Sequence, residues 1–343
     1  MRLFAGILHH LGRTSGLVVL LLVSCSGTDK SGWAPPALEI YAASYIGAVV
    51  RSLDGGKNWL SLGSDPRPLR AYRKMLALGP DGEVYVATSG GGLYCLARDN
   101  DPYVKINREP KSENISALHL DLPEGMLWIG TRGDGVFASG DGGDTWTQRN
   151  DGLTAYHVNC LEGDPGNPSR IYCGTSAGLF AREQQGTWRE VPAFSGLDVR
   201  DLLVLPEAGV VYAALGWTGT GSCLMVSGND GLAWEPADGG LPRSTVSCMA
   251  CDRSDGRILA GTASGIYERS PGDKRWRRKG SNLSDVAVLA LAAAQGHSYA
   301  ATSQGFFGIG PGARHWVELS LGLNPSAVTD VILCSPAPTS TQQ

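Results

Sequence analysis

The stretch VFASGDGGDTW, residues 136–146, decides how the rest of the chain is interpreted. Gly142 and Gly143 supply the positive φ angles that a tight hairpin turn needs. The carboxylate of Asp141 can accept hydrogen bonds from N–H groups of the same turn. Trp146 begins the returning strand, where its large ring can be buried beneath the turn. The stretch therefore predicts a β-hairpin whose turn carries a Ser-x-Asp-x-Gly-x-Thr-Trp motif.

The motif recurs along the chain at a nearly constant step. Its full form is made by Ser139, Asp141, Gly143, Thr145 and Trp146. A second copy is made by Ser52, Asp54, Gly56 and Trp59. A third, degenerate copy is made by Ser227, Asp230 and Trp234. Four further copies keep little more than the aromatic, so aromatics fall at residues 59, 103, 146, 188, 234, 276 and 316. Subtracting neighbours gives steps of 44, 43, 42, 46, 42 and 40 residues, which match the period of one four-stranded propeller blade.

A second marker precedes each aromatic: a strand, small residues at a turn, and then a glycine, as in IYCGTSAG from Ile171. Two markers that recur in phase seven times predict an all-β, seven-bladed β-propeller of four-stranded antiparallel blades. The first blade has no inner strand on its N-terminal side, whereas residues 327–333 form an orphan strand near the other end. We expect this C-terminal strand to join the N-terminal blade, because an open ring would leave unpaired strand edges.

The motif resembles the Asp-box, or BNR repeat, of sialidases, sortilin-type receptors, and photosystem II assembly and stability factors. In sialidases these boxes are structural turns remote from the chemistry, which implies that Asp54, Asp141 and Asp230 are turn residues and not catalysts. The architecture is most similar overall to the photosystem II assembly and stability factors. That resemblance implies a binding or scaffold propeller, such as an assembly factor for a membrane complex.

The N-terminus has the features of an export signal. Arg2 and Arg13 are followed by an apolar run over residues 17–23, which is too short for a stable membrane span. The sequence LVSC, which ends at Cys25, resembles the bacterial lipobox. This resemblance implies acyl chains on Cys25 and an extracytoplasmic location on a bacterial membrane, namely the outer membrane, facing the periplasm or the cell surface. An ordinary signal peptide with an incidental cysteine is the alternative. The predicted parts are a signal peptide (1–24), a lipid-anchored flexible tether (25–36), the propeller (37–336) and a disordered tail (337–343).

Charge and cysteine content narrow the classes of partner. Without the two arginines of the leader, the 29 basic residues fall to 27 against 33 acidic ones, so a nucleic-acid partner is not expected.

Seven cysteines besides Cys25 leave at least one thiol free, although a bridge between Cys160 and Cys173 is conceivable. Cys248 and Cys251 lie in one predicted strand and point to opposite faces. The histidines show no ligand spacing, so neither a metal nor a cofactor is predicted, and a monomer is expected.

The partner is expected on the face around the channel mouth, where the loops of propellers vary without disturbing the blades. This face is predicted to carry a protein or glycan partner. Its candidate residues, each of which could equally be a solvated loop residue, are Arg67, Arg70, Arg73, Lys74, Tyr45, Arg132, Asp134, Tyr156, Arg200, Trp217 and Arg243.

The alternative function is a glycan-binding protein or a sialidase-type glycoside hydrolase. A sialidase needs three arginines around the sugar carboxylate, a tyrosine nucleophile with a glutamate partner, and an aspartate acid/base. The early Phe/Tyr-Arg-Ile/Leu-Pro motif of that family is absent from this chain. No catalytic residue is therefore predicted.

Overall fold

The computed structural model describes residues 38–44, 49–63, 74–79, 82–97, 101–106, 112–121, 125–183, 186–205, 209–216, 219, 221–320 and 328–334. The chain divides into two units, Met1–Gly32 and Trp33–Gln343, and all the described residues belong to the second. The predicted leader, tether and tail, with Cys25, lie outside the described residues. No helix in the described part has the length and apolar character needed to cross a membrane.

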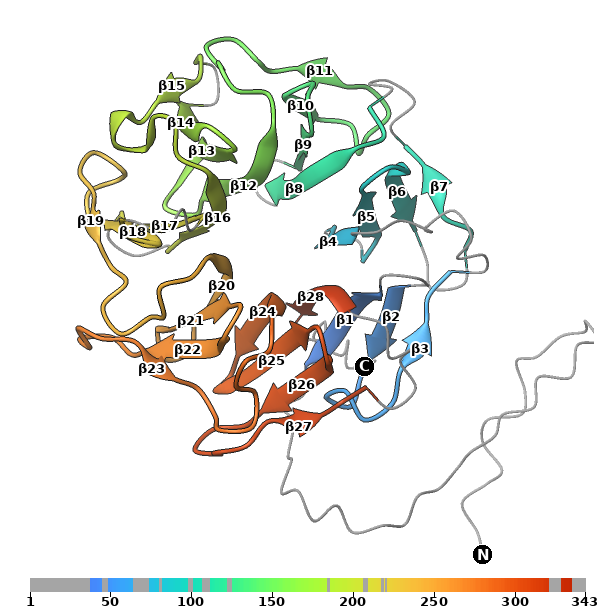
Figure 1. Ribbon diagram of the computed structural model, residues 1–343. Coiled ribbons are helices and arrows are strands. Elements are labelled where there is room, and N and C mark those ends of the chain that lie inside the picture. Colours follow the sequence, from blue (N-terminus) through green and yellow to red (C-terminus); the bar gives the residue numbers. More distant parts are fainter. Residues whose placement is uncertain are drawn as a thin grey trace, which may run out of the picture. The chain divides into compact units, whose positions relative to one another are not determined.

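The second unit is a ring of seven four-stranded antiparallel sheets, each of which is one blade (Figure 1). Blades two to four contain β4 (Lys74–Leu78), β5 (Val84–Thr88), β6 (Gly92–Leu96), β7 (Val104–Lys105), β8 (Ile115–Asp121), β9 (Met126–Thr131), β10 (Val136–Ser139), β11 (Thr147–Gln148), β12 (Val158–Asp164), β13 (Asn167–Thr175), β14 (Gly178–Glu183) and β15 (Arg189–Glu190). Blades five to seven contain β16 (Val199–Val204), β17 (Val211–Leu215), β18 (Leu224–Ser227), β19 (Glu235–Pro236), β20 (Val246–Asp252), β21 (Arg257–Thr262), β22 (Gly265–Arg269), β23 (Arg277–Arg278), β24 (Val288–Ala294), β25 (His297–Thr302), β26 (Gly305–Ile309) and β27 (Val317–Glu318). The seven-bladed prediction is confirmed.

Blade one closes the ring with strands from both ends of the chain. Its sheet order is β28-β1-β2-β3, with bounds Val328–Cys334, Glu39–Ser44, Val49–Ser52 and Leu60–Ser61. The inner strand β28 pairs antiparallel with β1, and Tyr41 lies opposite Ile332 in this register. Val328 and Val331 are buried in one apolar cluster with residues of blade seven. The predicted closure by the C-terminal strand is confirmed.

The apolar core lies between neighbouring blades. Second strands such as β5 and β17 are buried along their whole length, because neighbouring blades cover both faces. The outer strands are two residues long, and β11 and β15, for example, are exposed. At the seam between blades three and four, Trp128 of β9 packs in one cluster with Phe180 and Trp188 of blade four. Each seam is therefore made by the face of one blade against the next.

The small residues of the second marker allow this close approach. A Cβ atom on Gly130 would lie 2.3 Å from Cγ1 of Val158 in the next blade. The threonine that follows the small residue fixes the turn, because the Thr175 hydroxyl donates a hydrogen bond to the Gly178 carbonyl over 2.8 Å. The Thr262 hydroxyl makes the same bond to the Gly265 carbonyl over 2.9 Å.

The strand order gives the ring two different faces. The turns after second strands, such as residues 176–177, and the links between blades, such as residues 149–157, lie on one face, which we call the link face. The turns between first and second strands and those between third and fourth strands lie on the opposite face, which we call the hairpin face. The Asp-box-like turns therefore lie on the hairpin face, and the described candidates Arg132, Asp134, Tyr156 and Arg243 belong to the link face.

Candidate functional site

The turn at residues 139–146 has the hydrogen bonds expected of a structural element. The Ser139 hydroxyl donates to Asp141 Oδ1 over 2.7 Å and accepts from the Gly143 N–H over 2.9 Å. Asp141 Oδ1 also accepts from the Thr145 N–H over 2.9 Å. The bond from the Thr145 hydroxyl is the main cause that lowers the pKa of Asp141, to about 2. The carboxylate is thus held as an ionised acceptor inside its own turn.

The first copy repeats this arrangement, and the third changes its acceptor. The Ser52 hydroxyl donates to Asp54 Oδ1 over 2.8 Å. In the third copy the Ser227 hydroxyl donates to Asn229 Oδ1 over 2.9 Å, and Asn229 Oδ1 accepts the Ala233 N–H. The prediction placed Asp230 among the motif residues, but Asn229 takes the acceptor position because it stands two residues after the serine. Asp230 has a φ of 58° and forms an ion pair with Arg170.

Six of the seven periodic aromatics donate a hydrogen bond to the preceding blade. The bonded carbonyl belongs in every case to the residue just after the fourth strand of the preceding blade. The ring polar atoms of six aromatics donate in this way: Tyr103 to Leu62, Trp146 to Ile106, Trp188 to Arg149, Trp276 to Ala237, Trp316 to Lys279 and Trp59 to Leu319. Six of the seven seams thus have one such hydrogen bond, and the aromatics recur at the length of one blade, 40–46 residues.

Trp146 makes this bond as the longer of two, because its Nε1 lies 3.4 Å from the Ile106 carbonyl and 3.0 Å from the Gly143 carbonyl of its own turn. Trp234 of blade five bonds within its own turn alone. Its Nε1 donates to the Gly231 carbonyl of its own turn over 2.9 Å. The short 3₁₀ helix Pro192–Phe194 lies in the link that precedes blade five, and Phe194 packs edge-on against the Trp234 ring at 4.6 Å. The longest step in the sequence, the 46 residues from Trp188 to Trp234, has another origin: eight residues, 216–223, separate β17 from β18, where only two separate β13 from β14.

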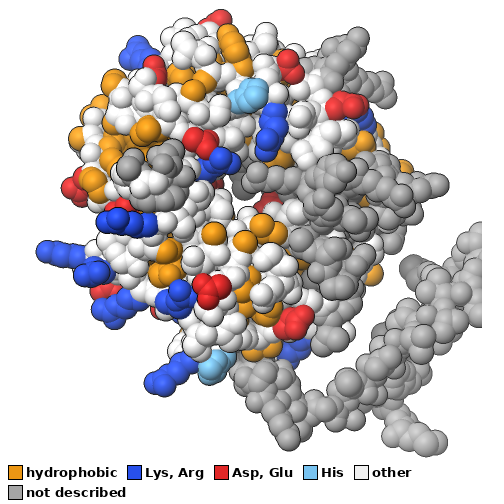
Figure 2. All heavy atoms as spheres, viewed as in Figure 1, with side chains coloured by type: hydrophobic (Ala, Val, Ile, Leu, Met, Phe, Trp, Pro, Cys, Tyr) orange, Lys and Arg blue, Asp and Glu red, His pale blue; other side chains and the backbone are white. Residues whose placement is uncertain are grey.

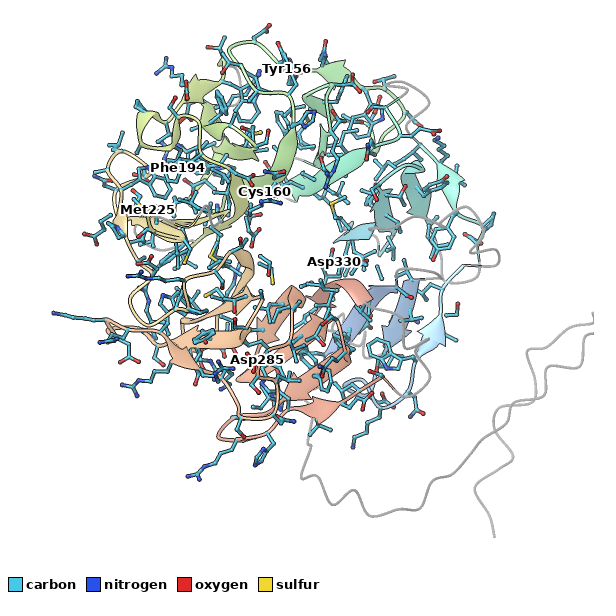
Figure 3. All side chains as sticks on the ribbon, viewed as in Figure 1. Tyr156, Cys160, Phe194, Met225, Asp285 and Asp330 are labelled. Carbon is cyan, nitrogen blue, oxygen red and sulfur yellow. The ribbon has the colours of Figure 1, made fainter. Side chains whose placement is uncertain are left out.

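The central channel is a cavity of about 210 Å³ lined by inner strands of all seven blades. Cys160 on β12 and Asp330 on β28 mark opposite sides of it in Figure 3. Channel side chains bond across the seams: the Asp330 carboxylate accepts the Leu76 N–H over 2.9 Å, and the Asp201 carboxylate accepts the Met249 N–H over 2.7 Å. These aspartates therefore satisfy inner-strand N–H groups of the next blade, which would otherwise be left unpaired.

Glu162 is the unusual acid of the channel. About a third of its side chain, 36%, is exposed to the channel space, yet the inner strands surround it. Its Oε2 lies 3.8 Å from Nδ1 of His119, whose pKa is lowered to about 4 by burial, so this histidine is neutral at pH 7. Loss of hydration, together with the neighbouring charge of Asp201, raises the pKa of Glu162 from 4.5 to about 8. Glu162 therefore retains its proton at neutral pH.

We expect Glu162→Gln to stabilise the protein at pH 8.5 and to leave its stability at pH 4 unchanged. Between 4.5 and about 8 the folded protein holds a proton that the unfolded chain releases, so stability falls as the pH rises through this window. Glutamine has no proton to lose. Thermal unfolding from pH 4 to 8.5 measures the effect, with Glu190→Gln on the exposed strand β15 as the matched control. Parallel profiles for the wild type and Glu162→Gln would show the prediction to be wrong.

The candidate residues of the link face lie on different blades. Arg132 and Tyr156 are neighbours: Arg132 is bridged to His157, and the Gly133 N–H donates to the Tyr156 carbonyl over 3.1 Å. Arg200 lines the channel cavity and is paired with Asp198 over 2.6 Å. Exposed Arg243 lies in the link between β19 and β20. The other candidates, namely Arg67, Arg70, Arg73, Tyr45 and Trp217, lie outside the described residues, as does the side chain of Lys74.

The described cysteines do not form a bridge. Cys160 and Cys173 lie on the paired strands β12 and β13, as expected, but all seven described cysteines are free thiols. Within the described residues no group of three or more His, Cys, Asp or Glu side chains is placed to hold a metal ion.

Sequence reasoning missed Glu162. Its place in the inner strand is occupied by Ala77 in blade two, Leu203 in blade five and Ala250 in blade six, so an alignment of the inner strands would have shown a carboxylate at a position that is otherwise small or apolar in most blades. The change of acceptor at Asn229 was visible in the sequence as well, because the motif fixes its distance from the serine.

The fold defines the chain as a seven-bladed β-propeller of four-stranded blades. It is similar to the photosystem II assembly protein Ycf48 of Thermosynechococcus vestitus, with 24% identity over 148 residues that make up 42% of each protein. The chain thus matches less than half the length of this curated relative. A comparison with known protein families finds no match.

Solved structures show the same fold at low sequence identity. The GH74 enzyme of Niastella koreensis gives a TM-score of 0.67 with 15% identity, over 81% of this chain and 51% of the enzyme. YCF48 from Cyanidioschyzon merolae gives a TM-score of 0.55 with 13% identity, over 76% of this chain and 95% of that chain. At these identities the likeness concerns the fold alone.

Proposed function

We propose that this chain is a non-enzymatic binding or scaffold propeller that engages a protein partner through its link face. The observation that carries the proposal is Tyr156, a side chain 46% exposed on the link between β11 and β12 (Figure 3). Its carbonyl accepts hydrogen bonds from Gly133 and Gly135, so the link is held in place. Exposed Arg132 lies beside it. Tyrosine and arginine on a rigid support are the residue types that dominate protein–protein affinity.

The similarity to Ycf48 supports a role in the assembly of a membrane complex, and the leader supports an extracytoplasmic, lipid-anchored location. In this proposal residues 1–24 are a signal peptide, and Cys25 carries the acyl chains at the end of a flexible tether over residues 25–36. The propeller works as a monomer and uses no cofactor. Two or more acyl chains suffice for lasting attachment, because each buried CH₂ group contributes about 0.8 kcal/mol.

The test is affinity capture of the tagged, full-length protein from native membranes. The first variant combines Arg132→Ala with Tyr156→Ala, and the second replaces Arg67, Arg70 and Arg73 by Ala. The matched control combines Leu232→Ala with Arg314→Ala, which removes an exposed apolar side chain and an arginine from turns of the hairpin face. Cys25→Ser tests the anchor, and we expect it to move the protein from the membrane fraction to the soluble fraction.

We expect a partner that the wild type and the hairpin-face control retain and that the Arg132/Tyr156 variant loses. If only the variant with Arg67, Arg70 and Arg73 replaced by Ala fails to capture the partner, the binding site belongs to the link between blades one and two. If the control loses the partner and the link-face variants keep it, or if no variant changes what is captured, the link face is not the binding surface.

A second candidate is a glycan-active propeller, and the observation in its favour is the pair Glu162 and Asp201. Glycoside hydrolases use two carboxyl groups that flank the scissile bond, one of which acts as an acid. The channel space of about 210 Å³ is nevertheless smaller than the 300–1,000 Å³ usual for ligand sites. Hydrolysis of a sialoside or of xyloglucan that disappears in Glu162→Gln would establish this candidate, and the absence of hydrolysis would reject it.

A further inference from the structure

A separate pocket opens on the hairpin face, at the seam between blades five and six. Its volume is about 360 Å³, within the usual range for small-ligand sites. One wall comes from Leu205, Val210 and Tyr212 of blade five. The other comes from the two hairpin turns of blade six, around Gly256 and Pro271. The pocket lies on the opposite face from Tyr156, so it is independent of the proposed partner surface.

Arg269 is the main cation of this pocket. Its guanidinium carbon lies 5.1 Å from the ring centre of Tyr212 and 5.2 Å from that of Trp276, so the group is held between two aromatic rings. Its Nη2 donates to the Tyr212 hydroxyl. Among the described residues no carboxylate forms an ion pair with Arg269, although a guanidinium has five N–H donors.

Tyr212 supplies a further donor at the same place. Its side chain is 5% exposed, and burial raises the pKa of the phenol, which therefore stays protonated at neutral pH. Because its oxygen accepts the bond from Arg269, its own hydrogen remains available for a ligand. The arginine and the phenol thus direct neighbouring donors into one space, where an oxyanion would accept both.

The remaining lining residues define the ligand further. Arg253 and Arg269 bring two positive charges and Asp273 brings one negative charge, so the lining residues that the structure describes have a net charge of +1. Leu205, Val210 and Ile258 supply apolar walls. Lys and Arg side chains also gather at the outer edge of blade six, near β22 and β23 (Figure 2), outside the lining of the pocket.

We propose that this pocket binds a carboxylate carried by an apolar group. The charge of the lining matches one monoanion, and the apolar walls match the attached hydrocarbon. The carboxylate oxygens would accept from the Arg269 guanidinium and the Tyr212 hydroxyl, with Arg253 at the exposed rim. The carboxylate could come from a free aliphatic acid or from the C-terminus of a peptide with apolar last residues, and the experiment separates these two sources.

The test is calorimetric titration of the whole protein with four probes in two pairs. Hexanoate is compared with hexanamide, and a pentapeptide that ends in two leucines is compared with the same peptide amidated at its C-terminus. Fluorescence of Trp276, whose ring contacts Arg269, gives a second readout. We expect each acid to bind at least about tenfold more tightly than its amide, because the amide loses charge-assisted hydrogen bonds.

Three variants locate the site. Arg253→Gln alters only an exposed side chain, and Tyr212→Phe removes only the hydroxyl, so both should fold and weaken binding of the acids. Arg269→Lys keeps the charge but loses the planar fork, and we expect binding to fall about tenfold or more. The matched control Arg277→Gln removes the same charge from the exposed strand β23, outside the pocket, and should bind as the wild type does.

The outcomes are distinct. Tight binding of hexanoate alone indicates a small free acid, and preference for the peptide acid indicates a chain terminus; both support the pocket. Equal binding of acids and amides, or no binding at millimolar concentration, overturns the proposal. Equal losses in Arg253→Gln and Arg277→Gln also overturn it, because they would show a diffuse charge effect and not a site.

Discussion

We expect deletion of residues 328–343 to abolish the folded ring and deletion of residues 336–343 to leave it intact. The larger deletion removes β28, the inner strand of blade one, and exposes the ladder edge of β1. It also takes away the buried Val328 and Val331 and the Asp330 carboxylate that accepts the Leu76 N–H of blade two. Loss of this strand opens a gap between blades seven and two, and the exposed edge favours aggregation.

Size-exclusion chromatography and thermal unfolding measure this effect. We expect the shorter chain to be aggregated or to unfold without a cooperative transition, and the 336–343 deletion to unfold as the full chain does. A point variant keeps the strand but breaks its packing: Val331→Asp places a charge at a side chain that is 3% exposed. A monomeric 328–343 deletion that melts at the wild-type temperature would contradict the closure as a source of stability.

The fold could be predicted from the sequence because neighbouring blades must pack closely, and the residues that allow this packing recur from blade to blade. Each seam needs an aromatic donor near the end of a blade and a small residue on the second strand, as Trp188 and Gly130 show. These requirements are local, so they appear at a fixed step in the sequence. The missing inner strand of blade one and the orphan strand at residues 327–333 then determine the closure.

The sites were harder to predict from the sequence because they depend on residues that are distant in the chain and that the topology brings together. Arg269 and Tyr212 are 57 residues apart on different blades, and only Tyr212 belongs to a repeated marker. Glu162 has an altered pKa only because the ring surrounds it and places Asp201 nearby. The candidate face was assigned from the general location of propeller loops, and among the described members of that set the structure brings Arg132 and Asp134 of one turn together with Tyr156.

Replacing Trp188 by Ala is expected to destabilise the protein by about 3–5 kcal/mol, the range for a large buried aromatic. Trp188 is 2% exposed, packs with the seam between blades three and four, and donates to the Arg149 carbonyl over 2.6 Å. Trp188→Phe keeps most of the apolar surface but leaves that carbonyl without its partner, so we expect a loss of about 1–3 kcal/mol. Chemical denaturation of each variant measures both values.

Trp234 provides the matched control because its indole bonds within its own turn. Trp234→Phe keeps the edge-on contact with Phe194 and breaks no bond between blades. If the fastening between blades is the reason for the periodic tryptophans, Trp188→Phe must cost more than Trp234→Phe. Equal costs would mean that burial of the ring, and not the bond across the seam, maintains the period. The comparison therefore separates the two physical reasons for a 42-residue repeat.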